Sequence, residues 1–117
     1  MSSMAIENDA LIPLGYENYI KLFDALSHPM RIKIIGILAE ERQYVSQLAR
    51  MINISRPLLY MHLKKLEAAG LVSGHHEISE SGKAIKYYEL KLFDIHLTSE
   101  LLTELSRAIP IAENNEV

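Results

Sequence analysis

The sequence of 117 residues contains no cysteine. This absence excludes disulfides, cysteine-based zinc clusters, thiol nucleophiles and thiol redox sensing, and it agrees with a reducing compartment. No apolar run approaches the ~18 residues that a membrane helix needs. Glu7 and Asp9 stand where a signal peptide would carry positive charge. We therefore expect a soluble, cytoplasmic protein.

Sequence motifs of catalysis are missing as well. The five glycines are scattered, so there is no glycine-rich phosphate loop. Neither the His-Glu-x-x-His zinc motif nor the Gly-x-Ser-x-Gly nucleophile motif occurs. We expect a protein that is not an enzyme and that needs no cofactor.

What is present indicates one globular domain, since 49% of the residues are apolar and 23% are charged. Residues 1–13 lack periodicity and residues 113–117 are polar. We expect a flexible segment over 1–13, a domain over 14–110 and a flexible tail over 111–117.

The net charge of −3 is unevenly distributed along the chain. Residues 28–91 contain ten Lys and Arg but six Glu, a balance of +4, whereas the two ends together carry −7. A basic middle between acidic ends is compatible with nucleic-acid binding, and it is also compatible with an unevenly charged, solvated surface.

Apolar side chains at helical spacing predict helices over residues 16–26, 29–40, 45–51 and 55–69. Ser27 or His28 is expected to cap the second of these helices, with Pro29 in its first turn. Asn53 suits a tight left-handed turn before the fourth helix, Ser55 is its expected cap, and Gly70 ends it. In the second helix we expect a buried face of Ile34, Ile35 and Leu38, with Arg31 and Lys33 pointing outward.

Strand-like runs over residues 71–78 and 84–90 predict a hairpin with its tip near Gly82. A last helix is expected over 93–109, where leucines recur at a spacing of four. The expected fold is mainly α (α+β), with the element order α-α-α-α-β-β-α. Two helices joined by a short turn and followed by a hairpin form a winged helix-turn-helix.

The outward face of the helix over 55–69 is the informative part, because it holds basic and aromatic residues where a solvated helix usually includes acids. Arg56 is placed to bind a guanine edge, and Tyr60 to contact a thymine methyl or a phosphate. Lys64 and Lys65 suit phosphates, and Lys83 and Lys86 of the hairpin suit the minor groove or its phosphates. The DNA-binding residues that we predict are Ser55, Arg56, Pro57, Tyr60, Met61, Lys64, Lys65, Lys83 and Lys86.

The stretch from Leu22 to Leu90 resembles the ArsR family of winged-helix transcriptional repressors. The segments that carry the resemblance are Leu26–Arg31 with Ile34 and Leu38, Gln47–Ala49, Ile54–Ser55, Pro57, His62–Lys64, Leu66, Ala69–Val72 and Tyr87–Leu90. The resemblance implies a homodimer, DNA binding through the fourth helix and the wing, and release of DNA by an effector that the sequence does not name.

Independently, the first and last helices each have an apolar stripe wider than one small core covers. We expect them to form the dimer interface, with Tyr19, Phe23, Leu97, Leu101 and Leu105 as contacts.

The sequence departs from the family at its metal sites. Cysteines that bind metal in many members are replaced by Tyr44–Gln47. Asp94 and His96 look like half of the family's zinc site on the last helix, but Arg107 and Pro110 stand where the other half would be, so only two of four ligands remain. We therefore expect no metal site, with Asp94 capping the last helix and His96 at the surface.

Adjacent His75 and His76 point to opposite faces of a strand and cannot easily share one metal ion.

Our leading hypothesis is a homodimeric DNA-binding regulator, expected to be a repressor, on an inverted-repeat operator. Two alternatives remain: a winged-helix module for protein contacts, suggested by the negative net charge with Leu58 and Met61 exposed, and a zinc-responsive repressor using Asp94 and His96.

Overall fold

Four helices occupy the positions that the apolar periodicity predicts. They are α2 (Tyr16–Leu26), α3 (Pro29–Glu40), α4 (Val45–Ile52) and α5 (Arg56–Ala68). This computed structural model describes residues 15–112, so the expected flexible segment over 1–13 and residues 113–117 of the expected tail over 111–117 lie outside the described residues. Among residues 15–112, no helix is long and apolar enough to cross a membrane.

The capping residues show why these helices begin and end where they do. His28, and not Ser27, caps α3: its Nδ1 accepts from the backbone N–H of Met30 at 3.1 Å. Ser55 caps α5 by accepting from the N–H of Leu58 at 3.3 Å. Asn53 ends α4 in the left-handed conformation, with φ 57° and ψ 51°. The predicted turn chemistry of the helix-turn-helix is confirmed.

The hairpin is part of a three-stranded antiparallel sheet, which corrects the expected two strands. The predicted strands are β2 (Val72–Ile78) and β3 (Ala84–Leu90), paired from Val72 opposite Leu90 to Ile78 opposite Ala84. A third strand, β1 (Gln43–Tyr44), pairs with the other edge of β3. Two residues are too few to show an alternation in the sequence, so periodicity could not predict this strand.

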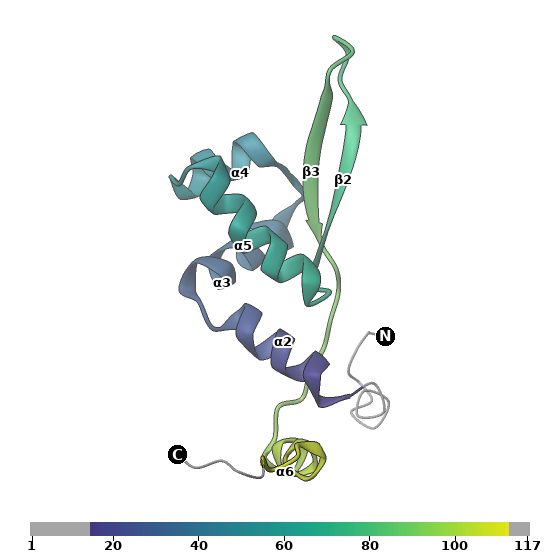
Figure 1. Ribbon diagram of the computed structural model, residues 1–117. Coiled ribbons are helices and arrows are strands. Elements are labelled where there is room, and N and C mark those ends of the chain that lie inside the picture. The colour runs from purple at the N-terminus through teal and green to yellow at the C-terminus, as the bar shows by residue number, and fades with distance from the viewer. Residues whose placement is uncertain (1–14, 113–117) are drawn as a thin grey trace. The chain divides into compact units, whose positions relative to one another are not determined.

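The described residues divide into two compact units. We call residues 21–91 the winged unit, and residues 15–20 with 92–112 the terminal unit. In the winged unit, α3, α4 and α5 lie together and the hairpin stands beside them, with its far end projecting past the helices (Figure 1). Leu59, Leu63 and Leu66 of α5 are buried, as are Ile34 and Leu38 of α3, whereas Ile35 is half-buried.

The last helix is shorter than expected. α6 spans Ser99–Ala108 because Thr98, whose hydroxyl accepts from the N–H of Leu101 at 3.0 Å, caps it. The prediction that the helix starts at residue 93 is wrong, and so is the prediction that Asp94 caps it. Leu97, which continues the leucine spacing, lies before the helix and is 62% exposed.

Candidate nucleic-acid interface

Helices α4 and α5 form the predicted helix-turn-helix within the winged unit. Leu48 and Ala49 of α4 and Leu59 and Leu63 of α5 are buried, which leaves the opposite side of α5 open to solvent. Such a helix presents one face to the core and can place the other in a DNA groove.

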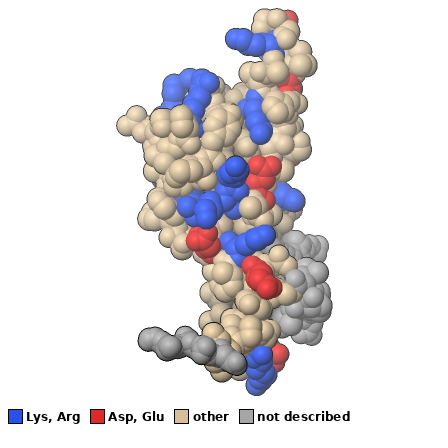
Figure 2. All heavy atoms as spheres, in the orientation of Figure 1, with Lys and Arg blue, Asp and Glu red and all other residues tan. Residues whose placement is uncertain are grey.

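The outward side of α5 carries the residues predicted to contact DNA. Arg56, Tyr60, Met61 and Lys64 are exposed, and Arg56 is the first residue of the helix. Over this face, Figure 2 shows Lys and Arg side chains gathered near α5 and along the hairpin, interrupted by a few carboxylates. The arrangement suits polyanionic DNA, since basic side chains neutralise phosphates.

A cleft of about 460 Å³ separates the start of α5 from the wing. It brings together four predicted site residues that are up to 30 positions apart in sequence: Arg56, Tyr60, Lys83 and Lys86. The other residues that line it are Tyr44, Val45, Ser46, His76, Ala84 and Ile85. Cationic side chains from α5 and from the wing therefore line the same cleft. From there they can contact the phosphates of one DNA strand from two sides.

Lys65 and Lys64 differ in their surroundings, although the sequence places them side by side. Lys65 Nζ lies 3.1 Å from Asp24 Oδ2 of α2, and both side chains are half exposed. Lys64 is exposed and has no ion pair among the described residues. Of the two lysines, Lys64 is therefore the one whose charge is not paired with a carboxylate of the described residues.

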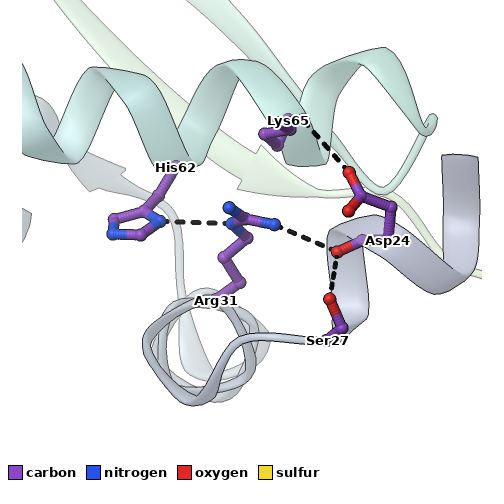
Figure 3. A network of polar contacts seen from close by, with 5 residues as sticks. All are labelled: Asp24, Ser27, Arg31, His62 and Lys65. Atoms are coloured by element: carbon purple, nitrogen blue, oxygen red, sulfur yellow. Dashed lines mark hydrogen bonds and ion pairs between the residues drawn. The ribbon is translucent and has the colours of Figure 1, made fainter.

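The inward side of α5 is joined to α3 by a polar network (Figure 3). His62 is only 4% exposed, and its Nδ1 accepts from Arg31 Nε at 3.2 Å. Arg31 Nη1 also donates to the carbonyl of Asp24 at 3.0 Å, so the prediction that Arg31 points outward is wrong. Burial, together with the nearby His28 and Arg31, lowers the pKa of His62. A neutral imidazole is required to accept from the guanidinium.

A second network, centred on Glu77, joins the three strands of the wing. The Glu77 carboxylate of β2 accepts from Tyr44 Oη at 2.6 Å and from Arg42 Nη2 at 3.3 Å. Arg42 lies 4.0 Å over the ring of Tyr87, on which His75 stacks from the next strand. The hydrogen bond from Tyr44, together with the charge of Arg42, lowers the pKa of Glu77. As expected, His75 and His76 face opposite sides: one packs on this network and the other lines the cleft.

On the cleft side of the hairpin, Lys86 extends along the sheet. Its Nζ lies 5.3 Å from the centroid of the Tyr88 ring, and a hydrogen bond with Tyr88 raises the pKa of Lys86. Gly74 of β2 lies so close to the Tyr88 ring that a Cβ added at Gly74 would meet the ring at 2.8 Å. Any larger residue at this position of the strand would require the buried Tyr88 ring to shift.

Comparison with known proteins agrees with this geometry. Residues 28–73 match the family model described as bacterial regulatory protein, arsR family. An uncharacterised HTH-type transcriptional regulator of Methanocaldococcus jannaschii is 36% identical over 86 residues, which are 74% of this chain and 90% of that protein. The chain belongs to the arsR family. It is a DNA-binding transcriptional regulator and not an enzyme.

Further relatives of this ArsR-family protein share its sequence or its fold. The HTH-type transcriptional repressor SmtB of Mycobacterium tuberculosis is 35% identical over 88 residues, covering 75% of this chain and 60% of SmtB. NolR from Sinorhizobium fredii has a TM-score of 0.56 at 23% identity, with 92% of each chain covered. The repressor BigR from Xylella fastidiosa has a TM-score of 0.54 at 24% identity, covering 79% of this chain and 84% of BigR. The winged helix-turn-helix fold is thereby confirmed.

The remaining candidate residues of the ArsR-family protein lie in the terminal unit, except Phe23, which belongs to the winged unit. Asp94 Oδ1 and His96 Nε2 lie 3.6 Å apart at the surface, and no group of three or more potential metal ligands occurs within residues 15–112. Of the predicted dimer contacts, Tyr19, Leu101 and Leu105 are buried within the single chain, Phe23 is half-buried and Leu97 is exposed.

Sequence reasoning missed Arg42, Tyr44 and Glu77, which lie at the wing without belonging to a motif. Arg42 and Tyr44 precede α4, whereas Glu77 is more than 30 residues further along the chain. No local spacing could bring them together. The one available signal was an acidic residue, Glu77, in a strand of the hairpin that also carries Lys83 and Lys86.

Proposed function

We propose that this protein is a homodimeric repressor that recognises an inverted-repeat DNA operator with α5 of each protomer. The observation that carries the proposal is the cleft between α5 and the wing, which gathers Arg56, Lys83 and Lys86 on one strip of surface. A solvated surface needs no such convergence of cations, whereas a duplex lying along α5 and the wing does.

Within this proposal, the outward residues divide into two roles. Arg56, in the first turn of α5, reads a base edge, because its planar fork can bind guanine O6 and N7 together. Ser55 and Pro57 hold the backbone of that turn, and Tyr60 and Met61 offer apolar surface to thymine methyls. Lys64, Lys65, Lys83 and Lys86 contact phosphates and set the register without reading sequence.

Dimerisation through the first and last helices is supported by the apolar side chains that the terminal unit leaves exposed. They include Ile20, Leu97, Leu102 and Ile109. Leu97 is one of the predicted contacts, whereas Ile20 and Leu102 each follow a buried predicted contact, Tyr19 and Leu101, by one position. A dimer is needed functionally, since one module of this size buries too little surface for a specific site.

Selection of bound fragments from a random duplex library tests the proposal. We expect enriched fragments to contain two similar half-sites related by a two-fold axis, about one helical turn apart. Affinity for them should fall steeply with salt. A protein-contact module, the alternative suggested by the negative net charge and the exposed Leu58 and Met61, would enrich nothing even at low salt. A requirement for added zinc would instead favour the metal-responsive alternative.

A further inference from the structure

The strand β1 is the least secure part of the sheet, and yet it joins the wing to the helices. It contributes two residues, Gln43 and Tyr44, which pair with Tyr88 and Tyr87 of β3. Helix α4 begins at the next residue, and the N–H of Tyr44 donates to Gln47 Oε1 at 3.0 Å. The orientation of the wing relative to the helix-turn-helix therefore depends on how firmly β1 is held.

Glu77, on the opposite edge strand of the sheet, holds β1 in place. It lies on β2, two strands away from β1, and its carboxylate accepts from Tyr44 and from Arg42 across β3. Arg42 in turn covers the Tyr87 ring of the middle strand. All three strands are thus joined at one side-chain cluster, in addition to the backbone ladder.

Tyr44 belongs both to this cluster and to the cleft beside α5, so it connects Glu77 with the candidate DNA-binding surface. It lines the cleft between α5 and the wing, together with Arg56 and Lys86. A change in the contact of Tyr44 with Glu77 would alter the separation between the cations of α5 and those of the wing. A duplex contacted by both binds more tightly when that separation is fixed before binding, because less conformational freedom is then lost on binding.

We infer that Glu77 is a positioning residue for DNA binding, which holds the wing at the distance from α5 that lets both contact one duplex. The inference rests on the proposed function. It assigns to an acidic side chain near the DNA surface a role that increases affinity. Simple electrostatics assigns the opposite role, because a carboxylate near phosphates repels them.

The two roles predict opposite signs for the same substitution. Glu77→Gln removes one negative charge and weakens both contacts, so positioning predicts several-fold weaker binding to a selected duplex, whereas charge repulsion predicts tighter binding. Glu80→Gln is the matched control, because Glu80 is an exposed acid of the same hairpin with no side-chain partner among the described residues. It removes the same charge and should leave affinity equal or slightly tighter.

A double-mutant cycle assigns the effect to the contact. Tyr44→Phe removes the hydroxyl without changing charge and should also weaken binding. Combined with Glu77→Gln, it should add little, since both substitutions disrupt one interaction. Lys83→Ala should cost less affinity in the Glu77→Gln protein than in the unaltered protein, because a displaced wing no longer uses Lys83. A merely structural role of Glu77 would leave the cost of Lys83→Ala unchanged.

Hydrogen exchange of the free protein separates this inference from the proposed function. The amides of residues 43, 44, 87 and 88 should exchange faster in Glu77→Gln than in Glu80→Gln, while those of α5 stay unchanged. If they do and the unaltered protein binds no duplex, the proposed function fails and the wing network stands. Equal exchange in the two variants, or equal or tighter DNA binding by Glu77→Gln, would overturn the positioning role.

Discussion

Two adjacent lysines of α5 are expected to behave differently when each is replaced by alanine. Lys64 has no ion pair among the described residues, whereas Lys65 Nζ lies 3.1 Å from Asp24 Oδ2. On binding DNA, Lys64 can give its whole charge to a phosphate. Lys65 must either share its charge between Asp24 and the phosphate or break its ion pair with Asp24.

The magnitude follows from counterion release. Each phosphate that a lysine neutralises adds about 0.9 to the slope of log affinity against log salt. Lys64→Ala should therefore flatten the slope by about one unit per protomer. Lys65→Ala should flatten it by clearly less. Asp24→Asn should steepen the slope and tighten binding, but only while Lys65 is present.

Fluorescence anisotropy of a labelled duplex, titrated between about 50 and 200 mM salt, measures these slopes directly. The control is Asp24→Asn in the Lys65→Ala background, where the substitution should have little effect. Equal slopes for the two lysine variants, with no effect of Asp24→Asn, would refute the argument from the ion pair. An unchanged slope in Lys64→Ala would place Lys64 outside the interface.

Three further outcomes are expected. Burial lowers the pKa of His62 in the folded chain below the ordinary histidine value of about 6.5. Near that pH the unfolded chain therefore binds more protons than the folded chain, so the free energy of unfolding should fall as the pH drops from about 7.5 to 5.5. Urea denaturation of His62→Gln should show a weaker pH dependence, and identical curves would contradict the assignment. Gly74→Ala should lower the melting temperature, since the new Cβ meets the buried Tyr88 ring at 2.8 Å; an unchanged melting temperature would mean that the ring shifts freely. Leu102→Glu should shift the protein towards monomer in sedimentation experiments, and an unaltered dimer would exclude Leu102 from the interface.

The sequence predicted those parts of the fold that depend on local chemistry. Helix bounds from α2 to α5 followed from apolar periodicity with Pro29, Asn53 and Ser55 as boundaries. The strands of the hairpin followed from alternation around Gly82. In each case the signal lies within a few residues of the element that it specifies.

Features that depend on distant residues could not be predicted. The ion pair of Lys65 with Asp24 and the hydrogen bond of Arg31 to His62 join segments that periodicity treats separately. The start of α6 was wrong for a local reason, because the leucine spacing extends the expected helix back through Leu97 whereas Thr98 caps it. The structure exposes the predicted residues of α5, whose contact with DNA stays a prediction, and the sequence did not reveal the side-chain contacts between the strands of the wing.

Base reading by Arg56 of α5 predicts a change in operator preference that can be measured position by position. The affinities of the unaltered protein and of Arg56→Ala are compared across every single-base variant of a selected operator. If Arg56 binds guanine through two hydrogen bonds, the variant should lose about 1 to 3 kcal/mol of discrimination at one symmetric pair of positions and keep its preferences elsewhere. A uniform loss at all positions would instead place Arg56 on a phosphate and leave base reading to Tyr60, contradicting the account.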